Sequence, residues 1–426
     1  MAMAKTVVIG AGLAGQSAAK AALSRDAAVT LIERSGSLPL RKDAWPQLIS
    51  KEAKLSQLEK EAELKLGQLA TAEARFSESV EGVDLPKGKV RTSRGTVSFD
   101  SLVIASGSVV LKAPLQGASK RNVYVMSTPD SFVQLGEHIS EISTIAVSGT
   151  SPLALGVAET LAKLAGKVIL FSAGGAMSST LNDSIRSILE SRIARSGVKM
   201  LDARAEGVAG VGKVEAILSA GSVYPCEALI LFPGSSPNPV NADLARGEAG
   251  GILVDREMRT SHKRVFAAGD CAEVKIGFTT FPMMYGSSAE AMGHVAGINS
   301  AGGSVQAGLS GVGLHSLFGL EICHAGVTLR EAKRSGIDAM EAVATLKDDK
   351  EKKCSILFSP RDRAILGVQI VGPGAAFFAG EASLAVSRRV SLDDLAYHDL
   401  PHLPAVSSDI SPLAKAARVG LSMVKK

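Results

Sequence analysis

The chain has 426 residues, of which 46% are apolar and 21% are charged. This composition is typical of a globular protein and excludes a disordered chain, and the length predicts two or three domains. The formal charge of +5 is spread over the chain without a basic run, and aromatic residues make up only 4% of it, so we expect no nucleic-acid site.

The N-terminal residues MAMAKTVVIGAGLAG lead from one lysine into a short apolar strand, without the longer apolar stretch and cleavage site of a secretory signal. We therefore expect a cytoplasmic protein. The longest apolar window, VQIVGPGAAFFAGEASLAV, is interrupted by Gly-Pro-Gly and contains Glu381, so we expect no membrane-spanning helix and no membrane association.

The four cysteines lie far apart in the sequence and form no CxxC pair. Because zinc sites and local redox disulfides are built from such close pairs, we expect no metal site. We expect ordinary reduced thiols in a reducing compartment. The cysteines are Cys226, Cys271, Cys323 and Cys354.

The first predicted unit, residues 5–34, is a strand, a glycine turn, an Ala-rich helix and a second strand. In the turn Gly10-x-Gly12-x-x-Gly15 the first glycine allows a tight bend, the second lets a pyrophosphate approach and the third lets helix and strand pack closely. The helix N-terminus offers N–H groups to the phosphates. Glu33 ends the second strand, where a carboxylate accepts hydrogen bonds from ribose hydroxyls. The unit therefore predicts a dinucleotide site.

Residues 50–76 have a charged, helical composition. The following segment KVRTSRGTVSFDSLVIASGS predicts a hairpin and then a buried strand that ends at Ser106 and Gly107. Strands that end in glycine turns face the ligand in sheets of this kind, so this turn is a candidate part of the same site.

A second unit with the same pattern, residues 144–172, repeats the first. Its turn places Gly149, Ser151 and Ala154 at the three glycine positions, and Ser172 stands where the first unit has its acid. Ser151 adds a side chain where a pyrophosphate should approach, whereas alanine is an accepted substitute at the third position. We therefore expect the fold of a dinucleotide domain with an eroded site.

Two further features weaken this second site. Pro152 lacks an N–H group that would face a phosphate, and Ser172 offers neither the carboxylate expected for NAD nor an arginine for a 2′-phosphate. The following residues SAGGAM are candidates for backbone contacts. We leave open whether this site uses NAD(P)H with poor selectivity or not at all, with Gly149 as its candidate contact.

Two more buried strands are predicted in YPCEALILFPGSSPNP and KRVFAAGDCAE; each runs into a turn, and the second turn contains Gly269 and Asp270. A small-residue helix is predicted from about Ser287 to Asn299. From about Gly311 the pattern changes to a hairpin around Ser-Pro-Arg-Asp, a helix and a Pro-rich segment, which predicts an antiparallel α+β domain.

These segments carry a family resemblance. FDSLVIASGS resembles the pattern YDxLVxATGS, LFPGSSPNP resembles ATGxxPN, and VFAAGDCAEV resembles the flavin fingerprint VFAAGDCA. Near the C-terminus LAYHDLPHLPAVSSDISPLAKAA is similar to AYxPPYSPxxDPxxxAA. Over essentially its whole length the sequence thus resembles the FAD-dependent pyridine-nucleotide:disulfide oxidoreductases, in particular the branch of NADH oxidases, NADH peroxidases and coenzyme A-disulfide reductases.

The resemblance implies an α/β fold with two Rossmann-like three-layer domains, for FAD and NAD(P)H, and a C-terminal α+β dimerisation domain. The FAD domain would comprise residues 1–112 and 243–310, the NAD(P) domain residues 113–242 and the dimerisation domain residues 311–426. A homodimer is implied, with Asp270 hydrogen-bonded to the ribityl chain of FAD. The candidate FAD contacts are Gly10, Gly12, Leu13, Ala14, Gly15, Glu33, Arg34, Lys42, Ser106, Gly107, Gly269 and Asp270.

The same resemblance shows where residues are missing. In the oxidase and peroxidase branch a redox cysteine follows the ribose-binding glutamate at the start of a helix, whereas here Lys42 and Asp43 stand near that place. The family also has a glutamate beside the nicotinamide, which corresponds to Gly156. Lys42 is a candidate to stabilise an anionic reduced flavin, and a solvated Lys-Asp pair is the alternative.

His402 lies in the Pro-rich segment that reaches the partner's flavin in relatives, near the place of their aromatic residue. It is a candidate proton donor to the reduced flavin around neutral pH, and a packed or solvated histidine is the alternative.

The leading functional hypothesis is a flavoenzyme in which NAD(P)H reduces FAD and the flavin passes electrons, without a cysteine relay, to oxygen, a quinone or a small electron-transfer protein. The alternative is an FAD-binding paralogue with a degenerate NAD(P) site, acting as a structural or regulatory subunit. The basic, weakly amphipathic end SPLAKAARVGLSMVKK favours either a helix of the dimer domain or quinone reduction at a membrane surface.

Overall fold

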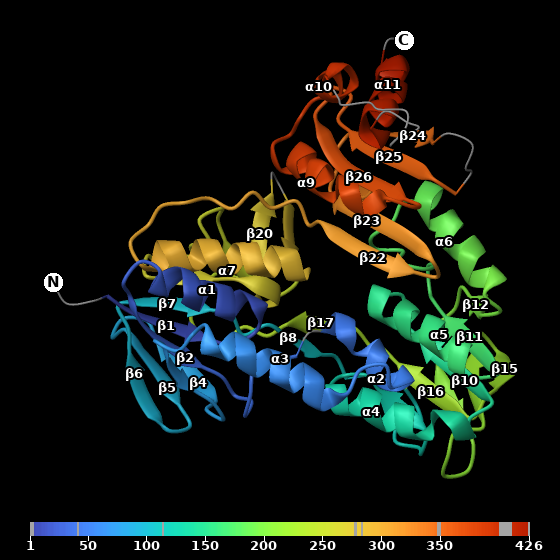
Figure 1. The fold of residues 1–426 in the computed structure, drawn as a ribbon, viewed down its shortest axis with the longest axis horizontal. Helices are drawn as coiled ribbons and strands as arrows, with labels where there is room; N and C mark the ends of the chain where they lie inside the picture. Colours follow the sequence, from blue (N-terminus) through green and yellow to red (C-terminus); the bar gives the residue numbers. More distant parts are fainter. Residues whose placement is uncertain are drawn as a thin grey trace. The chain divides into compact units, whose positions relative to one another are not determined.

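The computed structural model describes residues 4–40, 42–112, 115–276, 279–282, 284–346, 351–399 and 411–424 (Figure 1). The chain forms two compact units, each assembled from separate segments of the sequence. The first unit comprises Met1–Arg41, Ala53–Leu111 and Ser235–Leu309, and the second comprises Lys42–Glu52, Lys112–Gly234 and Ser310–Lys426. The sequence-based division into FAD, NAD(P) and dimerisation domains stays a prediction.

The first unit is built on a five-stranded sheet in which every neighbouring pair is parallel. Its inner strands are apolar runs that are almost wholly buried, as expected for parallel strands covered on both faces. Because all strands point the same way, their carboxyl ends share one edge. In sheet order the strands are β19 (Val265–Ala267), β7 (Ser101–Ile104), β1 (Lys5–Ile9), β2 (Ala28–Ile32) and β3 (Glu73–Arg75).

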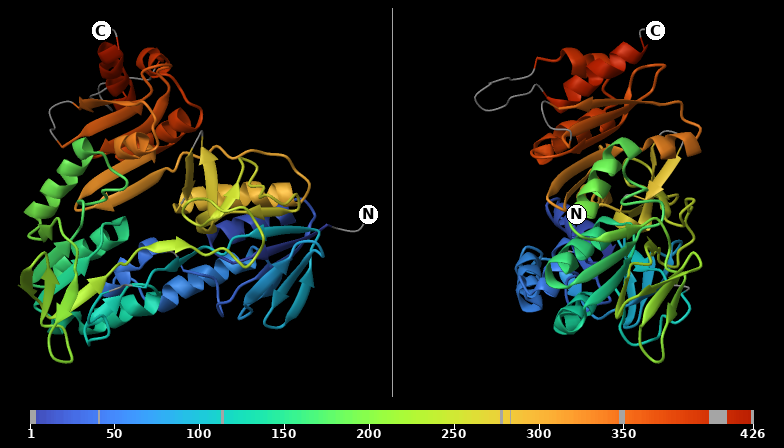
Figure 2. Two further views of the ribbon diagram at one scale, coloured as in Figure 1. Left: turned by 180° about the vertical axis from the view of Figure 1, so that it is seen from behind. Right: turned by 90° about the vertical axis from the view of Figure 1, so that its right-hand side faces the viewer.

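Two helices of the first unit, α1 (Leu13–Leu23) and α7 (Gly286–Ser300), run side by side on this sheet (Figures 1 and 2). A Cβ atom at Gly297 would overlap the carbonyl oxygen of Ala18, and Gly293 has the same problem with the backbone of α1. The two helix backbones therefore approach so closely that glycine is required at these positions of α7.

Further elements belong to the first unit. The predicted hairpin before β7 is present as β5 and β6, and the charged segment contains α3. The elements are α3 (Leu55–Gly67), β4 (Val80–Asp84), β5 (Lys89–Thr92), β6 (Gly95–Ser98), β8 (Ser108–Val110), β17 (Ser235–Pro237), β18 (Ile252–Val254), the 3₁₀ helix η3 (Gly269–Cys271), β20 (Ala272–Ile276) and β21 (Thr279–Pro282).

The second unit contains the repeat of the first. Its five-stranded sheet is again parallel, and the succession β10, α5, β11 copies β1, α1, β2. In sheet order the strands are β12 (Lys199–Leu201), β11 (Lys167–Phe171), β10 (Thr144–Ser148), β16 (Ala228–Leu231) and β9 (Val123–Val125). Associated elements are η1 (Lys42–Ala44), α2 (Pro46–Ser50), α4 (Pro129–His138), η2 (Ile139–Glu141), α5 (Pro152–Leu164), α6 (Asp183–Arg195), β13 (Gly207–Ala209), β14 (Ala216–Ser219) and β15 (Ser222–Pro225).

The C-terminal part of the second unit is a five-stranded antiparallel sheet with helices packed against an apolar core (Figures 1 and 2). The hairpin expected around Ser-Pro-Arg-Asp is β25 and β26. The predicted fold class is thus confirmed. The elements are β22 (Gly313–Leu317), β23 (Leu320–Gly326), α8 (Leu329–Arg334), β24 (Met340–Thr345), β25 (Lys353–Phe358), β26 (Ile365–Val371), η4 (Ala375–Phe378), α9 (Ala379–Ser387), α10 (Leu392–Tyr397) and α11 (Pro412–Val424).

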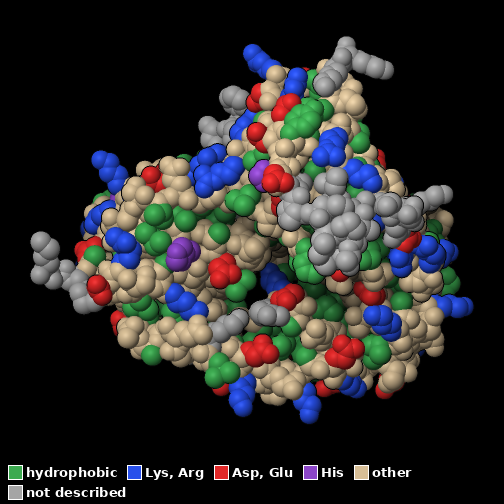
Figure 3. Space-filling view, turned by 45° about the horizontal axis from the view of Figure 1, so that its top comes forward, with side chains coloured by type: hydrophobic (Ala, Val, Ile, Leu, Met, Phe, Trp, Pro, Cys, Tyr) green, Lys and Arg blue, Asp and Glu red, His purple; other side chains and the backbone are tan. Residues whose placement is uncertain are grey.

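The surface carries a mixture of charges. On the face drawn in Figure 3 acidic and basic side chains are interspersed, and neither sign forms a continuous stripe over the described residues. Nowhere in the described part of the chain is a helix both long enough and apolar enough to cross a membrane.

The close packing of α7 on α1 makes a testable prediction. Gly297→Ala should lower the free energy of unfolding by about 1–3 kcal/mol, because the added methyl group collides with backbone atoms of α1. The matched control is Gly380→Ala in α9, where a Cβ meets no atom within 4 Å. This control should be neutral or up to about 1 kcal/mol more stable, since alanine is the better helix former. Urea unfolding of both variants checks the prediction, and equal effects would contradict it.

Candidate functional site

The glycine turn after β1 has the geometry expected of a dinucleotide turn. Gly10 has φ +96°, and a Cβ there would overlap the carbonyl oxygen of Ala105. A Cβ at Gly15 would overlap the carbonyl oxygen of Gly10, so helix and strand approach as the motif requires. At Gly12, by contrast, a Cβ would meet no atom within 4 Å. Gly12 therefore borders open space at the point where a pyrophosphate would approach.

The N-terminus of α1 keeps its hydrogen-bond donors free. Gly12 is the N-cap and supplies no capping side chain, and the first helical hydrogen bond runs from Gln16 N to Gly12 O at 2.9 Å. The N–H groups of Leu13, Ala14 and Gly15 find no acceptor among the described residues. Three donors and the positive end of the helix dipole thus remain for an anion.

Glu33, after the second strand, is held in place by the same turn. One carboxylate oxygen accepts a hydrogen bond from Ala11 N at 2.8 Å, and the other accepts one from Ser35 N at 2.9 Å. The side chain is buried at 6% exposure. A carboxylate has about four acceptor positions, so about two remain for ribose hydroxyls. The neighbouring Arg34 is exposed.

The turn after β7 joins a second turn of the same unit. Ser106 Oγ donates to Asn238 O at 2.6 Å, and Asn238 N donates to Gly107 O at 2.9 Å. Ser108 Oγ donates to a carboxylate oxygen of Asp270 at 2.9 Å. Gly107 has φ +70° and no atom within 4 Å of its Cβ direction. Asn238 and Ser108 were missed as site residues, although both lie in the motifs that indicated the family.

The turn at Gly269, after β19, is the last of the turns that form the first site. Gly269 has φ +75°, and its Cβ would approach the side chain of Ala14 to 2.9 Å, so Asp270 lies beside the free end of α1. Turns after β1, β2, β7 and β19 therefore meet at one edge of the parallel sheet, the position where ligands bind in such folds. The free donors, the open glycines and the two buried or half-buried carboxylates fit a dinucleotide such as FAD.

Cys271 directly follows Asp270, but its thiol is not available as a nucleophile. It is fully buried, and its Sγ donates to the carbonyl oxygens of Ile104 at 3.3 Å and Ala268 at 3.4 Å. Burial raises the pKa of this thiol above its ordinary value. The thiol therefore stays protonated at neutral pH, and only a thiolate is a good nucleophile.

In the corresponding turn of the second unit, most of the backbone N–H groups are capped or absent. Ser151 is the N-cap of α5, and its Oγ accepts a hydrogen bond from Ala154 N at 3.3 Å. The first helical residue is Pro152, which has no N–H. Of the three donors that α1 leaves free, α5 leaves only the N–H of Leu153. The self-capped start of α5 is thus a much poorer anion site than the start of α1.

The loop that follows β11 also lies against this turn. Met177 N donates to Thr150 O at 3.0 Å, and Gly175 N donates to Ser172 O at 2.9 Å. Ser172 itself is fully buried, and its Oγ has no hydrogen-bond partner among the described residues. The backbone donors of SAGGAM are therefore less available for a nucleotide than the sequence indicated.

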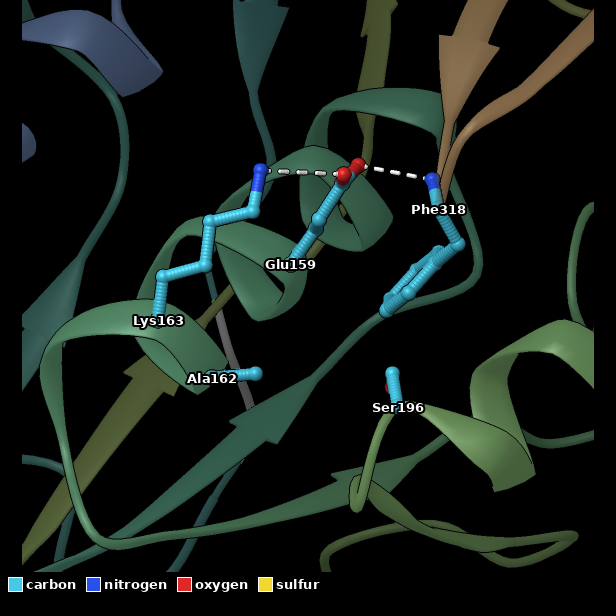
Figure 4. A pocket seen from close by; sticks show the side chains of 5 residues that line it. All are labelled: Glu159, Ala162, Lys163, Ser196 and Phe318. Carbon is cyan, nitrogen blue, oxygen red and sulfur yellow. Dashed lines mark hydrogen bonds and ion pairs between the residues drawn. The ribbon is translucent and has the colours of Figure 1, made fainter.

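A pocket of about 180 Å³ lies farther along α5, away from its N-terminus (Figure 4). Glu159 accepts hydrogen bonds from Lys163 Nζ at 3.2 Å and from the backbone N–H of Phe318 at 2.7 Å. Phe318 lies in the turn between β22 and β23 with φ +51°. Glu159 thus holds a turn that phenylalanine rarely adopts, which indicates a structural role for this pocket.

Lys42, Gly149, Gly156 and His402 were also singled out in the sequence. Lys42 is exposed at the start of η1 and, with Gly149, belongs to the second unit. His402 lies outside the described residues. At Gly156 a Cβ would make ordinary contacts with Leu317 and Pro46, so the glutamate of the family is missing from the sequence rather than excluded by packing. The catalytic roles of Lys42 and His402 stay predictions.

No group of three or more His, Cys, Asp or Glu side chains among the described residues is arranged to hold a metal ion. The fold and the first site, with a second unit of the same build in one chain, are typical of oxidoreductases that bind FAD and NAD(P)H.

Comparisons with known proteins agree with this class. A family model described as pyridine nucleotide-disulphide oxidoreductase matches residues 4–293. The NADH oxidase of Methanocaldococcus jannaschii is 30% identical over 76% of this chain and 76% of its own length. The NAD(P)H sulfur oxidoreductase (CoA-dependent) of Pyrococcus furiosus is 26% identical over 80% of this chain and 81% of its own length.

A solved structure, the NAD-dependent persulfide reductase from A. fulgidus, is similar in fold, with a TM-score of 0.89 and 23% identity over 99% of this chain and 84% of that chain. The chain belongs to the pyridine nucleotide-disulphide oxidoreductase family. Proteins of this family use FAD and NAD(P)H, and the chain is an FAD-dependent NAD(P)H oxidoreductase.

The open space at Gly12 makes a prediction about flavin binding. Gly12→Val should leave the fold intact, because its Cβ direction is empty and its φ of −67° suits any residue. The purified variant should nevertheless lose most of its FAD, since the side chain fills the space for the pyrophosphate. The control is Gly67→Val at the end of α3, which also borders open space.

Flavin absorbance per chain and far-UV circular dichroism are the measurements. A folded Gly12→Val protein with the flavin content of the Gly67→Val control would contradict the placement of FAD at this turn.

Proposed function

We propose that this chain passes electrons from NAD(P)H through FAD to an acceptor that needs no cysteine relay, such as oxygen, a quinone or a small electron-transfer protein. The observation that carries the proposal is the contrast between an intact first nucleotide site and a set of thiols that are all buried. The bound flavin would supply the chemistry of accepting a hydride and releasing electrons. The residues of the first unit would hold it and exclude water.

The four cysteines support the proposal through their surroundings. Burial raises the pKa of Cys226 and of Cys323 to about 11. Burial also raises the pKa of Cys271 and of Cys354 above the ordinary value. Reduction of a disulfide or persulfide begins with a reactive thiolate, and at pH 7 these groups are protonated thiols.

Cys323 and Cys354 do not form a disulfide either. Both pair with Ile370, Cys323 from β23 and Cys354 from β25, so one strand lies between them. Neighbouring strands are about 4.8 Å apart, which places the two Cα atoms about 10 Å apart. A disulfide needs Cα atoms within about 7 Å. This pair therefore offers no redox couple without a rearrangement of the sheet.

A second candidate function rests on the self-capped start of α5. With Ser151 Oγ on Ala154 N and Pro152 at the first helical position, pyrophosphate binding loses most of its backbone donors. In this candidate the protein keeps the FAD site and a degenerate NAD(P)H site, NAD(P)H reduces its flavin only slowly, and its main role is that of a structural or regulatory subunit.

We also propose that the chain works as a homodimer through its C-terminal antiparallel part. Phe377, Leu384 and Tyr397, from η4, α9 and α10, are large apolar side chains with exposed fractions of 62% to 89%. We take these exposed apolar side chains, all from the C-terminal part, as candidate contacts of the dimer. Light scattering at micromolar concentration should give the mass of two chains, about twice 43.9 kDa. A monomer would contradict the proposal.

The cysteine-free mechanism predicts the behaviour of a variant without thiols. When all four cysteines are replaced by alanine, NADH-dependent reduction of oxygen or of an artificial quinone should stay within about threefold of the wild-type rate, because no thiol takes part. Thermal unfolding serves as the control, since replacing buried residues costs stability. Turnover of coenzyme A disulfide should be negligible in the wild type. Rapid disulfide turnover that one single-cysteine variant abolishes would contradict the mechanism.

The start of α5 makes a separate prediction. The double variant Ser151→Gly, Pro152→Leu copies the first unit and frees two backbone donors. The NADH concentration for half-maximal flavin reduction should fall by at least about tenfold, because each N–H that meets a charged group is worth about 1.5–3 kcal/mol and only a small part of this gain is lost with the cap. Leu153→Ala, beside the same turn, is the control for local disturbance. An unchanged or higher half-saturation value would contradict this account of the site.

A further inference from the structure

The adenosine end of the second nucleotide unit has an unusual set of charges. In such units the residue after the second strand contacts the ribose 2′-hydroxyl, or an arginine nearby binds the 2′-phosphate of NADP. Here that residue is Ser172, which is fully buried with an unpartnered Oγ among the described residues. A neutral hydroxyl at this place favours neither nucleotide by itself, so selectivity depends on the loop that follows.

Carboxylates occupy the backbone donors of this loop. Gly174 N donates to Asp202 Oδ1 at 2.6 Å, and Ala176 N donates to Glu190 Oε1 at 3.1 Å. The N–H groups of Gly175 and Met177 donate to backbone carbonyl oxygens. Four successive N–H groups that would form an anion site are therefore engaged, two of them by negative charges.

The guanidinium beside the loop is not available to a phosphate either. Arg186 donates to Asp183 Oδ1 at 2.7 Å and to the carbonyl oxygen of Gly174, and its Nε lies 3.8 Å from Glu190. Only 17% of its side chain is exposed. A second cation, Arg330, reaches only the far end of the loop, where it donates to Ser178 O at 3.3 Å. The loop around Gly174 thus has three carboxylates near it, Asp183, Glu190 and Asp202, and one guanidinium, that of Arg186.

We infer that the second nucleotide site selects NADH over NADPH, and that Glu190 and Asp202 are its specificity-determining residues. The inference rests on the proposed function, in which this site receives NAD(P)H. A 2′-phosphate would add about two negative charges beside these carboxylates, and the N–H groups of Gly174, Gly175, Ala176 and Met177 that could bind it are already engaged, which is costly. The 2′-hydroxyl of NADH carries no charge and meets no such repulsion.

Calorimetric titration of the FAD-loaded protein with NAD⁺ and with NADP⁺ tests the inference. NAD⁺ should bind at least about tenfold more tightly, as expected when like charges are brought together. The double variant Glu190→Gln, Asp202→Asn removes both charges and keeps an acceptor for each backbone N–H. It should strengthen NADP⁺ binding by about tenfold and change NAD⁺ binding by less than about threefold.

The matched control is Glu137→Gln on α4, an exposed carboxylate on a helix beside β9, at the opposite edge of the sheet from β12. It should alter neither affinity, which separates a local effect from a general change of charge.

Anaerobic reduction of the flavin by NADH and by NADPH, measured in parallel, distinguishes failure of the inference from failure of the function. Equal or tighter NADP⁺ binding, with flavin reduction by NADPH, overturns the inference and leaves the proposed function in place. Preferential NAD⁺ binding without flavin reduction supports the inference and contradicts the function. Binding of neither nucleotide overturns both.

Discussion

The N–H groups at the first turn of α1 are free, whereas those at the first turn of α5 are largely capped or absent. How well each unit can bind a dinucleotide depends on this difference. The N-terminus of α1 has no capping side chain and leaves three donors open toward the edge where four parallel strands end. The N-terminus of α5 is capped by Ser151 and begins with Pro152. A free helix start leaves N–H groups that water or a ligand can satisfy, whereas a capped start satisfies part of them with its own side chain. The start of α1 therefore offers a dinucleotide more free N–H groups than the start of α5 does.

Close packing of α1 against its sheet and against α7 holds the turn at Gly12 in place. Gly10 and Gly15 bring α1 against its sheet, and Gly293 and Gly297 bring α7 against α1, so the first turn is fixed on both sides without a side chain. Gly269 places Asp270 next to this helix start. Because these contacts are made by backbones and by the short side chain of Ala14, the site geometry does not depend on flexible side chains, and binding pays little for ordering them.

Much of this architecture was predictable from sequence, because glycine motifs and buried apolar strands are local signals. The strand-turn-helix units, the acid Glu33 and the C-terminal hairpin all follow from short segments. The substitutions at Ser151 and Pro152 were also visible. The loss of backbone donors around them was only partly predictable. The hydrogen bonds from Met177 N to Thr150 O and from Ala176 N to Glu190 join segments that no local sequence pattern relates. The burial that raises the thiol pKa values likewise comes from tertiary packing.

We infer that an intact FAD site remains coupled to a weakened nucleotide site. Mixing the oxidised protein anaerobically with increasing NADH in a stopped-flow spectrometer measures this coupling. We expect the flavin absorbance to bleach completely, at a rate that saturates only at high NADH concentration, because one of three backbone donors remains at α5. Flavin absorbance that stays unchanged with saturating NADH and with NADPH would contradict it.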